Sequence, residues 1–457
     1  MTLFKRSISS RGVAAFAGEV FLIGGSIALA LRINEPVADP ASLWWKAAVT
    51  AALWQLVLYY NDFYDLTVVH SNRELVVRLL QAAGTAALIL AALYALVPAV
   101  DLGSRVILTS LLLFLVAVLG WRLVLHWVSR VEALEERVLI VGTSGAARTV
   151  ARQIAAQHDF PYRVVGFVDD EPDGIRGGER DGWLLGNTTE IPRLIEEYAI
   201  DRIVVGLADR RGRLPMQELV HAKLSGIRVE DATATYERIT GKLLVDNLRP
   251  SWLIFSDGFR VSSWTRLVKR AFDLLLASLG VLAGSPLMLL TALAIWLEDG
   301  FPVIYRQERV GENGRPFTLY KFRSMRKDAE GETPVWARDQ DDRVTTVGRA
   351  IRTTRIDELP QLWNVLRGDM SFVGPRPERP FFVAQLAAQI PYYEQRHAVK
   401  PGITGWAQVK YRYGASVEDA LEKLRYDLYY IKHLSTGFDL TILVDTVKVI
   451  LFGKGAK

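Results

Sequence analysis

Two adjacent carboxylates, Asp357 and Glu358, are the residues in this 457-residue chain whose type and spacing point most directly to chemistry. Arg352 and Arg355 precede them, and Pro360 follows almost at once. Because proline is tolerated only near the start of a helix, the carboxylates should lie immediately before or within a first helical turn. Helix N-termini favour anions, so this position could hold a diphosphate between the two arginines. The alternative is that the acidic pair only caps the helix.

Further basic side chains surround this motif in the sequence. Asn313-Gly314 is a hairpin signal between two strand-like segments, 305–310 and 317–322, and a hairpin would bring their basic residues side by side. Another arginine lies in Gly374-Pro375-Arg376-Pro377. We interpret these patches as phosphate-binding, although each alone could be a solvated surface. The candidates are Arg306, Arg309, Lys321, Arg323 and Arg376.

The elements that position these residues begin with membrane segments. Half of the residues are hydrophobic and there are 12 Trp, a composition less polar than that of an ordinary soluble enzyme. Four apolar runs each approach the ~20 residues that a spanning helix needs. The first could be a signal peptide, but no small-residue cleavage pattern follows it. The sequence predicts four transmembrane helices, at about 13–31, 43–60, 76–97 and 106–127.

The basic residues flanking these runs predict their orientation. Lysine and arginine accumulate before the first run, between the second and third, and around the end of the fourth, whereas the other two connections contain almost none. The basic ends should be cytoplasmic, and the chain after the fourth run should begin in the cytoplasm. The residues concerned are Lys5, Arg6, Arg11, Arg73, Arg78, Arg122, Arg130 and Arg137.

A doubly wound α/β domain is predicted next. Residues 137–142 have the pattern of a buried strand, followed by a glycine-containing turn at Gly142 and Gly145 and by a helix, and the alternation continues to about residue 206. The turn lacks the three-glycine fingerprint of dinucleotide sites, so a structural or regulatory domain is the alternative to nucleotide binding. Asp169 and Asp170 could reach a ribose or simply form a turn.

A fifth apolar stretch, 271–296, is long enough to cross the membrane but is interrupted by Ser285-Pro286. A simple crossing would place the basic and acidic motifs on the opposite side from the preceding domain. We therefore predict a re-entrant helix-break-helix over 269–297, with a kinked transmembrane span as the alternative. Asp273 could pair with Arg270 near the interface.

Cysteine is absent from the chain. Its absence excludes disulfides, thiolate zinc sites and cysteine nucleophiles. The net charge of +5 suits anionic lipids or phosphorylated substrates but is also ordinary for an inner-membrane protein.

Five motifs occur in an order that resembles the bacterial sugar transferases, also called monotopic phosphoglycosyl transferases. They are Lys269-Arg270 with Asp273, the Ser285-Pro286 break, 321–325, 356–361 and 374–377. The resemblance runs from Ser263 to the C-terminus. The four predicted spans and the Rossmann-like domain are similar to those of the larger, exopolysaccharide-type members.

The resemblance implies a reaction. Asp357 would attack the sugar-bearing phosphorus of a UDP-sugar, UMP would leave, and undecaprenyl phosphate would then attack the aspartyl intermediate. Glu358 would orient phosphate or, with Asp357, bind Mg²⁺. It also implies membrane lipid as a partner, a homodimer, no nucleic acid, and an active site on the cytoplasmic face of the bacterial inner membrane.

The expected architecture therefore has three parts: a transmembrane four-helix bundle (1–130), an α/β Rossmann-like domain (136–250) and an α+β catalytic domain with the re-entrant helix (263–457). Two rival functions remain. A membrane-bound nucleotide-sugar dehydratase or epimerase is disfavoured because the chain has no second glycine fingerprint and no Tyr followed four residues later by Lys. A non-enzymatic scaffold for lipid-linked sugars would tolerate substitution of Asp357.

Overall fold

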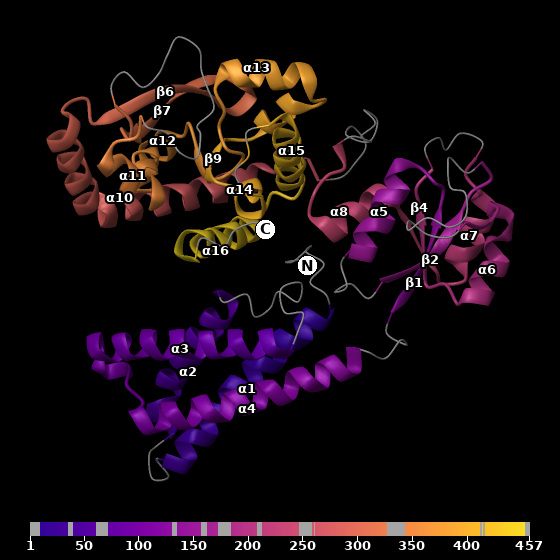
Figure 1. The fold of residues 1–457 in the computed structure, drawn as a ribbon, viewed down its shortest axis with the longest axis horizontal. Coiled ribbons are helices and arrows are strands. Elements are labelled where there is room, and N and C mark those ends of the chain that lie inside the picture. The colour runs from indigo at the N-terminus through magenta and orange to yellow at the C-terminus, as the bar shows by residue number, and fades with distance from the viewer. Residues whose placement is uncertain are drawn as a thin grey trace. The chain divides into compact units, whose positions relative to one another are not determined.

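The computed structural model describes residues 10–34, 40–60, 72–129, 135–156, 162–171, 184–207, 213–245, 258–259, 261–326, 343–411, 414 and 416–452. The chain divides into two compact units, one ending at Thr235 and the other beginning at Tyr236 (Figure 1). The first unit contains an all-helical part and a parallel α/β domain, and the second contains the acidic pair.

The N-terminal part consists of four long helices, as the apolar runs predict. The described residues of the whole chain contain two helices that are long and apolar enough to cross a membrane, at Ser104–Trp121 and Ser263–Asp299. Leu43–Leu58 and Ala82–Leu96 are shorter apolar helices. The four-span arrangement therefore stays a prediction. The helices are α1 (Ser10–Asn34), α2 (Pro40–Tyr60), α3 (Asn72–Leu96) and α4 (Ser104–Ser129).

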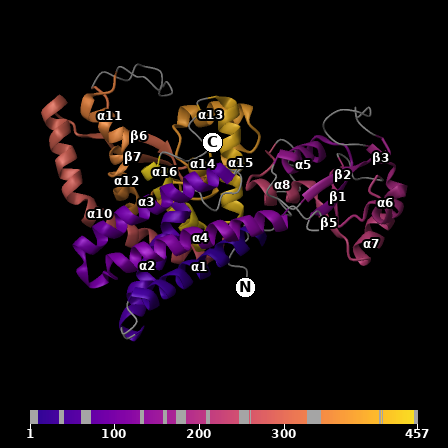
Figure 2. The ribbon, with the colours of Figure 1, turned by 60° about the horizontal axis from the view of Figure 1, so that its bottom comes forward.

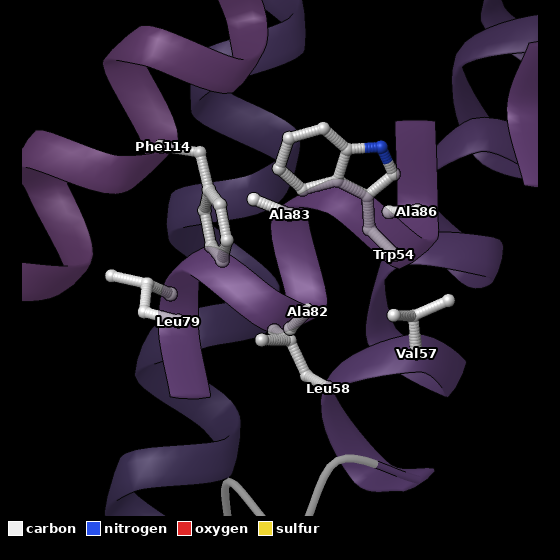
Figure 3. Close-up of a pocket in the computed structure, with 8 residues that line it drawn as sticks. All are labelled: Trp54, Val57, Leu58, Leu79, Ala82, Ala83, Ala86 and Phe114. Carbon is white, nitrogen blue, oxygen red and sulfur yellow. The ribbon is translucent and has the colours of Figure 1, made fainter. Parts of the chain in front are cut away.

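A small apolar cavity lies among α2, α3 and α4 (Figure 3). Trp54 and Phe114 meet edge to face beside it, with ring centroids 4.9 Å apart. Except for the Trp54 indole nitrogen, its lining side chains are hydrocarbon. It has no group that would recognise a polar substrate, and we regard it as a packing gap.

The middle domain is a five-stranded parallel sheet of order β3-β2-β1-β4-β5. α5 covers one face and α6 and α7 the other (Figures 1 and 2). This confirms the predicted Rossmann-like class. The strands are β1 (Glu136–Val141), β2 (Tyr162–Val168), β3 (Leu184–Gly186), β4 (Arg202–Val205) and β5 (Arg228–Asp231). The helices are α5 (Gly145–Ala156), α6 (Ile191–Tyr198), α7 (Met216–Leu224) and α8 (Ala232–Thr240).

The second unit is α+β. An antiparallel hairpin of β6 (Ile304–Val310) and β7 (Pro316–Phe322) confirms the prediction from Asn313-Gly314, and both turn residues have the positive φ that such a turn requires. A short parallel pair, β8 (Ser371–Val373) and β9 (Gly402–Thr404), lies among helices. These are α10 (Ser263–Asp299), α11 (Thr346–Thr353), α12 (Gln361–Arg367), α13 (Pro380–Gln389), α14 (Trp406–Lys410), α15 (Val417–Lys432) and α16 (Thr436–Phe452).

Helix α10 is continuous through Ser285 and Pro286, whereas the sequence predicted a break there. The helix bends instead, so that its two halves run in different directions (Figure 1). Both halves pack on the same unit. Ala277 of the first half contacts the apolar cluster of β7 and α12, and Ile295 of the second half packs with Phe322.

The polar residues at the start of α10 attach it to the rest of the unit. Arg270 donates to the carbonyls of Val365 and Leu366 at the end of α12, at 2.6 and 2.8 Å. Asp273 accepts instead from Ser371 Oγ and Phe372 N, both at 3.0 Å. The suggested Arg270–Asp273 pair is therefore wrong, because each side chain satisfies backbone or hydroxyl groups of a different segment.

Candidate active site

The acidic pair lies in a single 3₁₀ turn, Ile356–Glu358, directly before Pro360 and α12. This is the helix start that the sequence predicts. Arg355, the residue before the turn, has φ +57°, a left-handed conformation that non-glycine residues rarely adopt and that clusters at functional sites. The side chains of Asp357 and Glu358 are only 13% and 9% exposed, so burial affects the charge of both.

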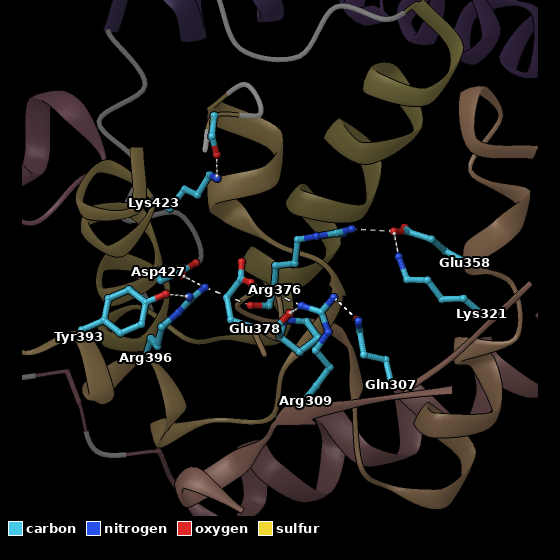
Figure 4. Close-up of polar contacts among 12 residues, drawn as sticks. Gln307, Arg309, Lys321, Glu358, Arg376, Glu378, Tyr393, Arg396, Lys423 and Asp427 are labelled. Atoms are coloured by element: carbon cyan, nitrogen blue, oxygen red, sulfur yellow. Dashed lines mark hydrogen bonds and ion pairs between the residues drawn. The ribbon is translucent and has the colours of Figure 1, made fainter. Parts of the chain in front are cut away.

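Glu358 is surrounded by cations (Figure 4). Lys321 Nζ and Arg376 Nη2 both donate to its Oε1, at 3.0 and 2.9 Å, and Arg355 Nη1 lies 3.6 Å from Oε2. Burial alone would raise the pKa of Glu358, but the charges of Arg376, Lys321 and Arg355 outweigh it and hold the pKa far below the usual glutamate value. Glu358 is therefore an anion throughout the physiological pH range.

Asp357 has a different environment from its neighbour. Burial raises its pKa, the charge of Glu358 raises it further, and Lys321, whose Nζ lies 4.0 Å from Oδ2, opposes the shift. Burial in turn lowers the pKa of Lys321. Two adjacent carboxylates whose pKa values are shifted in opposite directions are typical of active sites that assign them different roles.

Asn364 joins the acidic helix to the basic hairpin. Its side chain is fully buried, donates from Nδ2 to Thr318 O at 2.7 Å and accepts at Oδ1 from Tyr320 N at 3.1 Å. α12 is thereby fixed to β7, which contains Lys321. This amide side chain, together with the apolar cluster of β7 and α12, holds the strand of Lys321 against the helix that follows the acidic pair.

We expect Asn364→Ala to lower the free energy of unfolding by about 1–3 kcal/mol, because Tyr320 N and Thr318 O would lose buried partners. Thermal unfolding of the protein in detergent measures the effect. Gln389→Ala is the control, since Gln389 makes only an exposed bond to Gln385 O. Equal melting temperatures for the two variants would contradict the proposed role of Asn364.

Not all of the other basic residues that the sequence predicts to bind phosphate lie beside the acidic pair. Cross-strand pairing places Lys321 opposite Tyr305 and Arg306 opposite Tyr320, so strand alternation puts Arg306 on the other face of the hairpin from Lys321. The Arg306 guanidinium lies 5.9 Å from the Tyr320 ring centroid. Arg352 lies on α11 and contributes to the charge around Asp357.

Arg309 and Arg323 bind protein backbone. Arg309 Nη1 donates to Pro377 O at 3.0 Å, and Arg323 Nη2 donates to the carbonyls of Asp299 and Gly300 at 2.9 and 2.7 Å. Both side chains are largely buried. Their observed contacts are structural, because buried carbonyls without regular secondary structure need donors.

The Asp357–Glu358 pair suits a Mg²⁺ ion that also takes ligands from substrate phosphates. Within the described ranges there is no group of three or more His, Cys, Asp or Glu that could hold a metal. Mg²⁺ is often held by one or two carboxylates together with substrate phosphates, and the adjacent oxygen ligands of Asp357 and Glu358 match that requirement. The residues present therefore fit a metal that arrives with, or is completed by, a diphosphate.

The two acidic residues near the glycine turn of the middle domain, Asp169 and Asp170, accept hydrogen bonds from other residues of the same domain. Asp169 Oδ2 accepts from Thr143 N and Oγ1 at 2.8 and 2.7 Å, and Asp170 accepts from Thr188 N and Oγ1 in the same way. Gly142 has φ +98°, and a Cβ there would lie 2.9 Å from Gly206 backbone. Asp169 Oδ1 also accepts from Glu171 N in a local turn, whereas Asp170 joins two segments 18 residues apart.

Comparisons with known proteins identify the family of the chain. The family model described as bacterial sugar transferase matches residues 264–453, and a CoA-binding domain model matches residues 60–214. The chain belongs to the bacterial sugar transferase family. The first match includes the bent helix, the hairpin and the acidic pair.

Three relatives illustrate the similarity. A UDP-N-acetylgalactosamine-undecaprenyl-phosphate N-acetylgalactosaminephosphotransferase of Aeromonas hydrophila is 44% identical over 52% of the chain and 56% of its own length. An undecaprenyl-phosphate glucose phosphotransferase of Komagataeibacter xylinus is 35% identical over 73% and 62%. A UDP-glucose:undecaprenyl-phosphate glucose-1-phosphate transferase of Caulobacter vibrioides is 44% identical over 40% and 70%. The chain thus spans about three fifths of the first two relatives.

Proposed function

We propose that the protein transfers a sugar-1-phosphate from a UDP-sugar to undecaprenyl phosphate and releases UMP. The single observation that supports this most is the division of roles in the acidic pair: Glu358 is locked as an anion by Lys321 and Arg376, while Asp357 has a raised pKa and lies beside the same cations. An anionic nucleophile next to buried positive charge suits attack on a phosphorus atom. The printed names of the relatives describe the same donor and acceptor classes.

The proposed reaction has two displacement steps. In the first, an Asp357 carboxylate oxygen attacks the phosphorus that bears the sugar, and the bond from that phosphorus to the UMP oxygen breaks. In the second, a phosphate oxygen of undecaprenyl phosphate attacks the same phosphorus, and the bond to Asp357 breaks, which regenerates the carboxylate. Lys321 and Arg376 lie where they can neutralise charge on the transferred group.

Mg²⁺ is proposed as the cofactor. When bound, it would neutralise diphosphate charge, with Asp357 and Glu358 as the ligands from this chain. Lys321 and Arg376 both contact Glu358 Oε1, so Oε2, which lies 3.6 Å from Arg355 Nη1, would be the oxygen that binds the ion.

We also propose that the enzyme works at the cytoplasmic face of the bacterial inner membrane, with α10 as a re-entrant helix. A straight helix of 37 residues would span about 55 Å, yet both halves of α10 pack on the same unit. Its central face is apolar and exposed, with Leu279, Leu282 and Leu290 at 53%, 75% and 65%. A helix that dips into the bilayer and returns accounts for both features.

The absence of cysteine makes this topology testable. With Trp264→Cys near the start of α10 and Phe301→Cys just after its end, both single variants should react with a membrane-impermeant maleimide in inverted vesicles and neither in right-side-out vesicles. Leu282→Cys, in the middle, should react in neither. Labelling of the two ends from opposite sides would establish a transmembrane α10 and refute the re-entrant arrangement.

The four N-terminal helices are proposed to cross the membrane as a multi-pass anchor, and the protein is proposed to form a homodimer. The family match supports a role in starting exopolysaccharide or other glycoconjugate assembly. The sugar is left to experiment, because the relatives differ in it: one name specifies N-acetylgalactosamine and two specify glucose.

The assay that tests the function is UMP release from a panel of UDP-sugars by detergent-purified protein, with and without undecaprenyl phosphate and Mg²⁺. Acceptor-dependent release should occur with one or few donors. Without acceptor, labelled UMP should exchange into the UDP-sugar, since the first step is reversible and leaves the sugar phosphate on the enzyme. No release from any donor, by folded protein with several lipids, would favour the scaffold function.

A further inference from the structure

The segment that presents Arg376 to Glu358 has no regular secondary structure, yet its backbone carbonyls are hydrogen-bonded to other parts of the unit. Four successive carbonyls each accept a hydrogen bond. Pro375 O accepts from Gly402 N at 2.9 Å and Glu378 O from Val310 N at 2.9 Å. The two carbonyls between them accept from arginine side chains. Pro375 and Pro377 have no N–H, so the carbonyls are the main points at which this segment can be fixed.

The first of these arginines, Arg396, is completely enclosed. Its Nη2 donates to Arg376 O at 3.1 Å and to Asp427 Oδ2 at 2.8 Å, and its Nη1 donates to Tyr393 OH at 2.6 Å (Figure 4). The side chains of Arg396 and Asp427 are 5% and 2% exposed. One guanidinium therefore joins α15, which contains Asp427, to the backbone of Arg376.

The second arginine, Arg309, holds the next carbonyl from the hairpin side. Its Nη1 donates to Pro377 O at 3.0 Å and lies 3.4 Å from the carboxylate of Glu378. The planar fork of arginine allows one side chain to meet a carbonyl and a carboxylate together. Arg309 and Arg396 thus reach adjacent carbonyls from different elements.

The result is that the backbone of Arg376 is fixed while its side chain extends to Glu358. The Arg376 guanidinium makes the 2.9 Å contact that helps to keep Glu358 ionised. A small movement of its backbone would change that contact, and a misplacement of about 1 Å can reduce a rate by about 100-fold.

We propose that Arg309 and Arg396, the latter with Asp427, are positioning residues that set the place of the Arg376 guanidinium in the active site. The proposal rests on the proposed transferase function for its kinetic consequences, but its structural part does not. Arg396 acts through Arg376 and does not touch the reacting groups.

The experiment is a double-mutant cycle on the full-length protein, with Arg396→Lys and Arg376→Lys alone and together. Lysine keeps the charge of residue 396 but cannot bind Tyr393, Asp427 and Arg376 O in the same fork geometry. We expect Arg396→Lys to lower kcat by about 10- to 100-fold. In the Arg376→Lys background, the same change should lower kcat by less than about twofold, because the positioned group is already altered.

Hydrogen–deuterium exchange of a peptide that contains Gly402 gives a readout that does not depend on activity. The Gly402 amide donates to Pro375 O, so it should exchange faster in Arg396→Lys than in the wild type. Arg425→Lys is the matched control, because Arg425 lies on the same helix as Asp427 but pairs with Glu422 at 2.8 Å. The control should leave both kcat and exchange in this peptide unchanged.

Two outcomes would overturn the proposal. Losses of kcat that multiply in the double variant would show that Arg396 acts independently of Arg376, and unchanged exchange in a folded Arg396→Lys protein would show that it does not hold the segment. If Arg396→Lys does not fold, Tyr393→Phe, which removes one partner of Arg396, replaces it in both measurements. A wild type that releases no UMP would refute the proposed function, while the exchange result would still decide the positioning role.

Discussion

Replacement of Asp357 by Asn should reduce acceptor-dependent UMP release by about 10³-fold or more, the size of loss seen when a covalent nucleophile is removed. The amide is almost the same size as the carboxylate, so packing should change little. It cannot form the acyl phosphate, a mixed carboxylic–phosphoric anhydride, that the proposed two-step reaction requires. Glu358 cannot substitute for it, because its carboxylate is held by Lys321 and Arg376.

Exchange of labelled UMP into the UDP-sugar, without acceptor, tests the nucleophile separately from the lipid. Asp357→Asn should abolish this exchange together with overall transfer. Asp369→Asn is the matched control: it removes a carboxylate of the same unit that lies 3.6 Å from Arg367 and outside the acidic pair. Exchange that persists in Asp357→Asn would assign the nucleophile to another residue.

Replacement of Lys321 by Met should lower kcat at neutral pH by about 100-fold, comparable to the loss of one preorganised charge-stabilising donor. It should also move the acidic limb of the pH–rate profile to higher pH. Asp357 must be ionised to attack, so activity falls as pH falls through its pKa. Lys321 opposes the raised pKa of Asp357, and removal of that charge raises the pKa further. In Lys321→Met, the acidic limb of the pH–rate profile should therefore lie at higher pH than in the wild type.

The measurement is the pH dependence of kcat over the acidic and neutral range. Lys410→Met serves as the control, since Lys410 of α14 lies 3.6 Å from Asp445 of α16 and contacts neither carboxylate of the pair. An acidic limb that stays in place or moves to lower pH in Lys321→Met would show that the lysine does not stabilise the Asp357 anion.

Local sequence signals predicted much of what surrounds the site. The hairpin followed from Asn313-Gly314, and the helix start at the acidic pair followed from Pro360, because both residue types restrict the backbone locally. The parallel sheet of the middle domain followed from its strand-turn-helix alternation. The approach of Lys321 and Arg376 to the acidic pair agreed with the expectation that the basic segments converge.

The partners of the other polar residues could not be predicted, because they depend on tertiary contacts with backbone. Arg309 donates to a loop carbonyl and Arg323 to carbonyls at the end of α10, a role that residue type alone does not distinguish from phosphate binding. Asn364 and Arg396 were missed because a single polar residue in an apolar helix or short turn has no distinguishing pattern. Ser285-Pro286 predicted a break, but the helix tolerates Pro286 with a bend.

The bend in α10 has a consequence for how the lipid environment acts on the enzyme. Strand β7 contacts both halves of the helix, with Leu319 against the first and Phe322 against the second, and Lys321 lies between these two residues. Any change in the angle between the two halves would therefore be transmitted to the strand that contains Lys321. In the proposed membrane placement, the bilayer would act mechanically on the active site through this helix.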